Sequence, residues 1–499
     1  MTATMGLEKI KEVLGNGSEP HLMNGEQYLQ SLRDDRRVID RDGKDIGDVT
    51  KHPATRLAAD CYSRVYDLQF DPKTRDAMTY VDQRDNKRYS VGWQVPTTKE
   101  HLKQKYQALK YVTYQTFGMF GRPIDYGSMM AIGFLSTIDR VEKESKEFAD
   151  NIRNFVKFAR AHNVQSTDLI VDPQSDRRIP MAEKPGRLRI VEERSDGIVL
   201  YGSKVAGSVG SISHFFTLST VLGEDLHEDS AIWCAVPVNA KGLSLVLREP
   251  TIDPNADPED HPLESRVGEE LENYILFDHV FLPREYVFSA RNLNLLGLYF
   301  ESCSIALWHI LARLSIRAEL FLGTAQAITD ILGTNKIPGV REMVSEIATY
   351  AAATKSFVLA SIDEAVEWNG VMVPNPPLVT TGRLYSIWGY PRVQYLLRDM
   401  CGQALVSRFP KAIWDDPEIG KTLKEFLPGT GVTAREKNRF FNFVWDLTCG
   451  GYASRTGQFE NVNATPRSYI SELVYQHYER DEVTKYVREF AGISPESHT

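Results

Sequence analysis

Apolar residues recur at helical spacing over the first third of the chain. In HLKQKYQALKYVTYQTFG (101–118) and STIDRVEKESKEFADNIRNFVKFARAHN (136–163) they stand three or four positions apart among charged residues. This period gathers the apolar side chains on one face of an α-helix. We therefore predict a mainly helical domain over residues 1–163.

The pattern changes after Asn163, where short runs rich in β-branched residues are separated by Asp, Pro and Gly. The runs are DLIVDP, GRLRIVEERSDGIVLYGSKV, SAIWCAVPVN and GLSLVLRE. Such runs are typical of strands, and RSDG at 194–197 suits a hairpin turn. A central β domain is expected over residues 164–290.

Helical spacing then returns for the rest of the chain. ALWHILARLSIRAELFLGTAQAITDIL (306–332) and REMVSEIATYAAATKSFVLASIDEAVEW (341–368) are long and amphipathic, as bundle helices are. We predict a C-terminal helical bundle and tail over residues 291–499. The Pro-rich segments 253–262 and 374–378 are expected to be surface connections.

This order of helices, strands and helices predicts an α+β fold and argues against a Rossmann unit. GTGVTA at 429–434 follows LKEFLP rather than a buried strand, so a phosphate loop is not expected there. The motifs HExxH and GxxxxGK[ST] and paired Cys/His knuckles are absent from the sequence. Any chemistry is therefore expected to be that of a cofactor.

Composition narrows the class of partner. Of 499 residues, 42% are hydrophobic and 25% charged, and 58 basic against 67 acidic residues give a net charge of −9. This balance offers no electrostatic footprint for nucleic acid or a membrane surface, so small molecules and copies of the chain are the expected partners. There is no apolar leader and no uninterrupted run of about 18 apolar residues. Five scattered cysteines without a CxxC pair indicate free thiols in a reducing cytoplasm, and no metal site is expected.

Five segments stand out because they occur together and in one order. They are GEQYLQSLRDDRRVIDRDGKDIGDVTKHPATR (25–56), GRPIDY (121–126), TDLIVDPQSDR (167–177), AVPVNAKGL (235–243) and FDHVFLPREYVF (277–288). In this order they resemble the oxygenase component of two-component, FADH2-dependent aromatic monooxygenases, the 4-hydroxyphenylacetate 3-monooxygenase and chlorophenol monooxygenase family. The resemblance implies an acyl-CoA dehydrogenase-like fold, with the flavin between the β domain and the bundle, in a homotetramer.

The resemblance also implies a reaction. FAD would arrive as FADH2 by diffusion from a separate NAD(P)H-flavin reductase. It would then form a C4a-hydroperoxide with O2 and hydroxylate a small aromatic substrate of phenol type. Such an enzyme needs no NAD(P)H site of its own, in keeping with the missing Rossmann fingerprint. The chemistry requires a fixed cation, a base near the substrate hydroxyl and polar donors around a flavin shielded from water.

Three residues are the candidates for catalysis. Arg122 and Tyr126 match the family motif GRSPDY, whose Arg and Tyr line the substrate pocket, and an Arg stays charged and presents a rigid fork of donors. His309, in LWHILARLSIRAELFLG, overlays the family's HHQ near the start of the first bundle helix. An imidazole ordinarily titrates near pH ~6.5 and can take a phenol proton at neutral pH. The alternatives are a surface Arg at a turn and a structural His.

One position departs from the family in a way that bears on the substrate. The family usually has His where this chain has Asp168, and an ionised carboxylate accepts hydrogen bonds but donates none. We hypothesise that Asp168 receives a donor from a nitrogen heterocycle or an amino-substituted ring. The alternative is a drifted residue that points elsewhere.

The resemblance assigns the remaining site residues. Further substrate contacts are Ser219, Thr220 and Arg455, of which the first two align only by counting. The residues matching flavin contacts in the family are Gln174, Ser175, Asp176, Arg177, Ser208, Gly450, Gly451, Tyr452, Ala453 and Ser454. His214 has no counterpart in the family and is expected to be structural.

Other functions stay open at this point. The same flavin-oxygen chemistry could act on a nitrogen heterocycle by hydroxylation, ring cleavage or N-oxidation. A lyase resembling 4-hydroxybutyryl-CoA dehydratase needs a [4Fe–4S] cluster held by three Cys and one His, and no Cys lies between residues 62 and 233. A flavin-free scaffold with the same fold is the third alternative.

Overall fold

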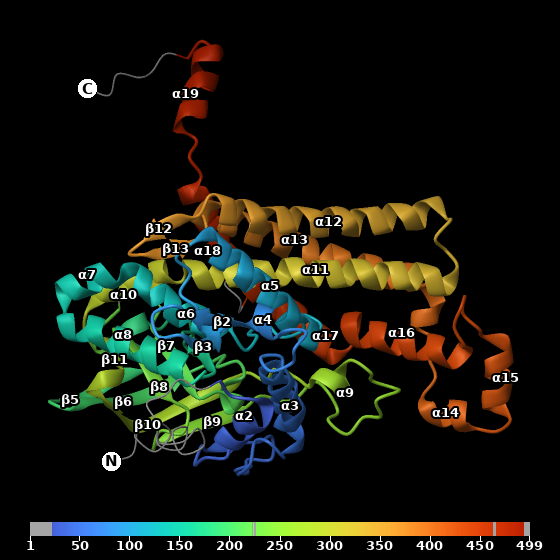
Figure 1. Ribbon diagram of the computed structural model, residues 1–499, viewed down its shortest axis with the longest axis horizontal. Helices are drawn as coiled ribbons and strands as arrows, with labels where there is room; N and C mark the ends of the chain where they lie inside the picture. Colours follow the sequence, from blue (N-terminus) through green and yellow to red (C-terminus); the bar gives the residue numbers. More distant parts are fainter. Residues whose placement is uncertain (1–21, 222, 224–225, 463–465, 494–499) are drawn as a thin grey trace.

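The computed structural model describes residues 22–221, 223, 226–462 and 466–493. Figure 1 shows the N-terminal helices and the β strands packed together beside three long helices, which are α11 (Ser304–Leu332), α12 (Pro338–Asp363) and α13 (Pro376–Cys401). The predicted order of helices, β domain and helical bundle is therefore confirmed.

Helices make up most of the N-terminal region. They are α2 (Gly25–Ser31), α3 (Pro53–Asp67), α4 (Arg75–Met78), α5 (Lys99–Thr116), α6 (Tyr126–Phe134), α7 (Ile138–Glu144) and α8 (Lys146–Ala161). The helical spacing over 136–163 is divided between two helices, because Ser145 ends α7 and its hydroxyl caps α8 by accepting a hydrogen bond from the Phe148 N–H.

Two β structures also form in this region. Strands β2 (Thr79–Asp82) and β3 (Lys87–Ser90) pair as a hairpin. Strand β1 (Val38–Ile39) pairs in parallel with β9 (Leu243–Leu247), which lies in the central domain. The first 163 residues therefore contribute an edge strand to the sheet of the next region.

The β domain consists of two sheets. One has the strand order β1-β9-β10-β6-β5 and the other has the order β11-β8-β7-β4. The strands not yet given are β4 (Ser166–Leu169), β5 (Arg189–Arg194), β6 (Gly197–Lys204), β7 (Phe215–Ser219), β8 (Ile232–Pro237), β10 (Asn273–Pro283) and β11 (Val287–Ala290). The hairpin predicted at RSDG is confirmed, because Arg194 pairs with Gly197 across the turn.

The C-terminal region is helical apart from one hairpin. In addition to the three long helices it contains α10 (Leu293–Ser302), α14 (Lys411–Asp415), α15 (Ile419–Phe426), α16 (Ala434–Thr448), α17 (Gly451–Val462), α18 (Arg467–His477) and α19 (Asp481–Phe490). The short helix α9 (Glu264–Val267) belongs to the connection between β9 and β10. GTGVTA joins α15 to α16, so no strand precedes it, as expected.

Two details of this region differ from the prediction. The helix predicted over 341–368 ends at Asp363, and the hairpin of β12 (Val366–Trp368) and β13 (Val371–Val373) follows it. The segment PNPPL does not form a connection along its length, because Asn375 caps α13 and the two prolines after it occupy the first turn.

Helix α11 is the centre of the bundle and packs against α12, α13, α5 and α6. Residues Leu293–Leu332 are long and apolar enough to cross a membrane by length and composition. Most of α11 is nevertheless buried against those four helices. Its apolar character is accounted for by its place in the core of the fold.

Helix α6 links the bundle to the β domain, because it packs against both α11 and β4. All nine of its residues are buried. A Cβ on Gly127 would lie 2.0 Å from the carbonyl oxygen of Ser166, so only glycine allows α6 to approach β4 this closely. This contact brings the residue before Gly127 beside the strand that carries Asp168.

Candidate active site

Arg122 lies in the turn that leads into α6, and its side chain is buried against β4. Its Nε donates to Asp168 Oδ1 at 2.7 Å and its Nη2 to Asp168 Oδ2 at 3.2 Å. Burial opposes the charge of the guanidinium, but the Asp168 carboxylate outweighs that effect and raises the pKa of Arg122 above its usual range. The two residues therefore form a bidentate, buried ion pair.

Tyr126 begins α6 directly beneath Arg122. The Arg122 guanidinium carbon lies 4.3 Å from the centre of the Tyr126 ring. Burial raises the pKa of the Tyr126 phenol well above its usual range, so this hydroxyl keeps its proton at neutral pH. The ring of His309 lies on the other side, 5.8 Å from the ring of Tyr126 between centres. Tyr126 thus connects the predicted cation to the predicted base.

His309 comes from the first third of α11 and is buried. Its Nε2 lies 3.0 Å from Oδ1 of Asp125, the residue that precedes Tyr126. The structure therefore brings Arg122, Tyr126, Asp168 and His309 together, although they come from three separate segments of the sequence.

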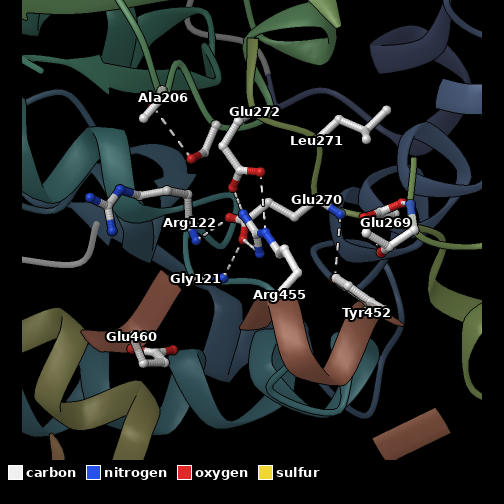
Figure 2. Close-up of polar contacts among 12 residues, drawn as sticks. Gly121, Arg122, Ala206, Glu269, Glu270, Leu271, Glu272, Tyr452, Arg455 and Glu460 are labelled. Atoms are coloured by element: carbon white, nitrogen blue, oxygen red, sulfur yellow. Dashed lines mark hydrogen bonds and ion pairs between the residues drawn. The ribbon is translucent and has the colours of Figure 1, made fainter. Parts of the chain in front are cut away.

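Glu270, in the approach to β10, holds the Arg122 turn in place. It accepts hydrogen bonds from the backbone N–H groups of Gly121 and Arg122, at 2.8 and 2.5 Å, and pairs with Nη1 of Arg455 at 2.8 Å. Figure 2 shows this carboxylate between the turn and the first part of α17. Its partner Arg455 also forms an ion pair with Glu272.

The ring of Phe459 packs so closely on Gly121, the first residue of GRPIDY, that no larger residue fits there. The ring of Phe459 lies 5.3 Å from the guanidinium carbon of Arg122 and 4.5 Å from that of Arg455, measured to the ring centre. A Cβ on Gly121 would lie 1.9 Å from this ring. The predicted contact residue Arg455 is thus joined to Arg122 through both Glu270 and Phe459.

Ser219 and Thr220 lie at the end of β7, the strand that pairs with β4. Asp168 is in register with Thr217, and Ser219 lies two residues further along, on the same face of its strand. The hydroxyl oxygens of Ser219 and Thr220 are buried, and neither has a hydrogen-bond partner. Buried hydroxyls of this kind are suited to a ligand, because otherwise their desolvation is uncompensated.

The predicted flavin loop after β4 lies largely at the surface. Gln174, Asp176 and Arg177 are exposed, and Asp176 forms an ion pair with Arg178. Ser175 differs, because its hydroxyl oxygen is buried without a hydrogen-bond partner. Of these four positions, Ser175 alone is thus shielded from solvent.

Ser208 lies beside the strand that carries Asp168. It is buried, and its carbonyl oxygen accepts a hydrogen bond from Thr167 Oγ1 at 2.9 Å. Its own hydroxyl is 3.4 Å from the carbonyl oxygen of Ala206, which Figure 2 shows on the β-domain side of the Arg122–Arg455 cluster. This position fits the flavin contact that the resemblance assigned to it.

The glycine-containing segment predicted to approach the cofactor begins in the turn after α16, at Gly450, and continues as the first residues of α17. The Tyr452 hydroxyl accepts a hydrogen bond of 3.4 Å from the Glu270 N–H, so the segment lies against the Arg122 cluster. Ala453 and Ser454 line a cleft of about 490 Å³ between α13 and α17. Gly450 lies beside Glu264, and Gly451 lies beside the backbone of Thr251.

A second charged cluster lies on the bundle side of α17. Glu460 Oε1 pairs with Arg313 Nη2 at 2.7 Å and with Arg317 Nη1 at 3.1 Å, and Arg383 Nη2 lies 3.6 Å from Oε2. All four residues are buried. Burial would raise the pKa of Glu460, but the three arginines outweigh it and hold the pKa at about 2.

Comparison with known proteins decides the family. Models described as the N-terminal and C-terminal parts of 4-hydroxyphenylacetate 3-hydroxylase match residues 24–289 and 294–492. The chain belongs to the 4-hydroxyphenylacetate 3-hydroxylase family. It is an FADH2-dependent monooxygenase in which helical N-terminal and C-terminal regions flank a central β domain.

Individual relatives agree with this assignment. The chain is 28% identical to the 4-hydroxyphenylacetate 3-monooxygenase oxygenase component of Thermus thermophilus, over 93% of this chain and 96% of the relative. It is 31% identical to an FADH2-dependent monooxygenase of Burkholderia cepacia, over 89% and 87%. A crystal structure of the oxygenase component of 4-hydroxyphenylacetate 3-monooxygenase with FAD superposes with a TM-score of 0.88 at 27% identity, over 94% of this chain and 98% of that one.

The oxygenase offers a polar group that fits a flavin. The buried hydroxyl of Ser175 lacks a partner, and a hydroxyl can satisfy the carbonyl or N–H edge of such a ring. An iron–sulfur lyase is not supported by the residues that the structure describes. Among them the one group of three side chains arranged to hold a metal is His261, Glu264 and Asp446, which includes no cysteine.

Sequence reasoning missed Asp125, Glu270 and the Glu460 cluster. Asp125 stands inside GRPIDY, and Glu270 belongs to the acidic string GEELE at 268–272. A string of acids reads as a solvated surface, yet Glu269 and Glu270 are 2% and 0% exposed. The available signal was the direct continuation of that string into the alternating pattern of β10.

Proposed function

We propose that this oxygenase hydroxylates a small phenolic ring held between Arg122, Tyr126 and His309. The observation that carries the proposal is the buried convergence of these three side chains. The similarity to 4-hydroxyphenylacetate oxygenases supports a substrate with a phenolic hydroxyl.

Each of the three side chains has a distinct task. His309 takes the proton of the substrate hydroxyl, which makes the ring electron-rich. The neutral Tyr126 donates a hydrogen bond, and Arg122 offers fixed positive charge where negative charge develops. The unpartnered hydroxyls of Ser219 and Thr220 are placed to bind a polar group on the rest of the substrate.

FAD, when bound in its reduced form, supplies two electrons and activates O2, so that one oxygen atom enters the ring and the other leaves as water. Ser208, the segment 450–454 and the loop 174–177 would hold it near the Arg122 cluster. The close packing of Phe459 on Gly121 excludes water from one side of Arg122.

Partners follow from the same proposal. Reduced FAD comes from a separate NAD(P)H-dependent flavin reductase by diffusion, since two-component relatives are named for their oxygenase component. The working form is a homotetramer in the cytoplasm, to be measured by light scattering and by fractionation of the source cells.

The test supplies the purified protein with FADH2, O2 and a panel of phenols and azaheterocycles. We expect incorporation of one oxygen atom per turnover into a phenol. His309→Ala should abolish hydroxylation while FAD binding and peroxide release persist. Peroxide with every phenol in the wild-type protein would reject the proposed substrate class, and unchanged product from His309→Ala would reject the base.

The ion pair between Arg122 and Asp168 favours a second substrate class. Because both carboxylate oxygens face the guanidinium, the pair presents a neutral edge with acceptor capacity beside the fixed cation. A nitrogen heterocycle with an N–H next to a carbonyl would match this edge better than a phenolate does. The reaction would then be hydroxylation, ring cleavage or N-oxidation of that ring.

Asp168→His discriminates the two classes. This substitution restores the residue that the resembled family usually has, and His can donate a hydrogen bond. If the heterocycle is the substrate, the variant should lose at least about 10-fold in kcat/KM for heterocycles relative to phenols, about 1.4 kcal/mol. An unchanged preference would remove Asp168 from substrate selection.

A further inference from the structure

Asp125 occupies a position at which an aspartate ordinarily caps a helix. It is the N-cap residue of α6, and an N-cap carboxylate normally accepts from a backbone N–H two or three residues later. In this structure the Asp125 side chain makes no capping hydrogen bond. Instead, Oδ1 lies 3.0 Å from His309 Nε2, at ion-pair distance but without hydrogen-bond geometry. The carboxylate is therefore directed at the proposed base rather than at its own helix.

A buried lysine lies behind this carboxylate. Lys105 of α5 donates from Nζ to the carbonyl oxygens of Val91 and Gly92, at 2.7 and 3.2 Å. Burial lowers the pKa of Lys105 to about 7, although the charge of Asp125 opposes this shift. A cavity of about 30 Å³, enough for a water molecule, touches Asp125 and Gly92.

No other acid in the described structure forms an ion pair with His309. Tyr126 faces it from α6 and stays neutral, and Arg313 lies one turn further along α11, where it is paired with Glu460. Cys303, at the start of α11, has its pKa raised by burial and stays a thiol. Among the described residues, Asp125 is thus the charged group that lies against the imidazole.

We propose that Asp125 is the positioning residue of the active-site base, holding His309 through Nε2 and pairing with the imidazole once it is protonated. This inference rests on the proposed function of His309. When the substrate O–H transfers its proton to Nδ1, the imidazolium pairs with the Asp125 carboxylate at Nε2.

The main test is Asp125→Asn. Asparagine keeps the shape but removes the charge, so we expect hydroxylation to fall at least about 10-fold in kcat while the KM for the phenol changes less than about 3-fold. Peroxide release should replace product. Asp125→Glu should retain more activity than Asp125→Asn. If Asp125→Asn does not fold, Asp125→Glu is the variant that is measured against the wild type. If the Asp125→Asn variant hydroxylates the phenol as fast as the wild type, the proposal is overturned.

A matched control and a double variant separate positioning from general damage. His279 and Asp278 form a similar pair, 2.9 Å apart between Nδ1 and Oδ1, but both residues are exposed. Asp278→Asn should leave product yield unchanged. The double variant Asp125→Asn with His309→Ala should release peroxide at the same rate as His309→Ala alone. A different rate in the double variant would show that Asp125 does not act through His309.

A readout without turnover distinguishes this inference from the proposed function. In protein labelled with 13C-histidine and free of FAD, the His309 resonance is assigned by its loss in His309→Ala. Asp125→Asn should change its tautomer distribution, and Asp278→Asn should not. An unchanged resonance overturns the pairing. A changed resonance in a protein that hydroxylates no phenol would retain the pairing and reject the substrate class.

Discussion

Two clusters of buried charge meet at consecutive residues of α17, and they differ in balance. On the β-domain side, three arginines face four carboxylates. These are Arg122, Arg248 and Arg455 with Asp168, Glu269, Glu270 and Glu272. On the bundle side, three arginines share the single carboxylate of Glu460. Phe459 contacts the first cluster, and the next residue completes the second.

The two clusters differ in how many carboxylate partners their arginines have. In the β-side cluster, Arg455 pairs with both Glu270 and Glu272, and Arg248 pairs with both Glu269 and Glu272. Loss of Glu269, Glu270 or Glu272 therefore leaves Arg248 and Arg455 each with a carboxylate partner. In the bundle-side cluster, loss of Glu460 leaves three buried cations without this counter-charge. Removal of one partner from a buried pair is the costly case.

The largest expected effect is therefore that of Glu460→Gln. We expect the free energy of unfolding to fall by about 3 to 5 kcal/mol, measured by urea denaturation. Glu346→Gln is the control, because Glu346 pairs with Arg392 on the surface, and its loss should cost less than about 1 kcal/mol. Equal stability of Glu460→Gln and the wild type would contradict the dependence on one carboxylate.

Next in size is Glu270→Gln. This substitution removes the negative charge that receives two backbone N–H groups and Arg455, so we expect a loss of about 2 to 3 kcal/mol in unfolding free energy. Product yield should also fall, because the Arg122 turn loses its anchor. Glu272→Gln should be milder, since Arg455 keeps Glu270. If Glu270→Gln and Glu272→Gln each lower the free energy of unfolding as much as Glu460→Gln does, the two clusters do not differ in their dependence on single carboxylates.

A pH titration examines the bundle-side cluster alone. The pKa of Glu460 is about 2 in the folded protein, below the ordinary value of 4.5. A carboxyl with a lowered pKa contributes stability above its unfolded pKa and loses it as pH falls through its folded pKa. The difference in unfolding free energy between wild type and Glu460→Gln should therefore shrink by about 3 kcal/mol between pH 4.5 and 2. A constant difference over this range would reject the assignment.

The smallest effect is expected outside both clusters. Arg177 is exposed, so Arg177→Ala should change the unfolding free energy by less than about 0.5 kcal/mol. If this loop contacts FAD, the variant should weaken FAD binding in a fluorescence titration. Unchanged binding would limit the cofactor contacts to the buried positions, such as Ser175 and Ser208.

The sequence alone was enough to predict the three regions of the fold and to select the residues that lie together at the charged centre of the site. The switch from helical to strand-like spacing and back located the three regions, and GRPIDY with the LWHILARLSIRAELFLG helix indicated Arg122, Tyr126 and His309. The helix predicted through residue 368 failed because a short apolar run fits either period. The Asn369–Gly370 pair, with φ of 50° and 75°, was the available hairpin signal.

The supporting carboxylates were beyond prediction for a different reason. Asp125, Glu270 and Glu460 each form ion pairs with residues at least 77 positions away in the sequence. Burial of an acid depends on where a distant arginine or histidine arrives. That information lies in the tertiary packing and not in local periodicity.

The contact of Gly127 with the Ser166 carbonyl has a consequence for evolvability. Because main chain rests on main chain there, the spacing between helix and strand does not depend on which side chain occupies position 168. On the proposal that Asp168 selects the ring, a single codon change at that position would alter recognition while α6 keeps its distance from β4.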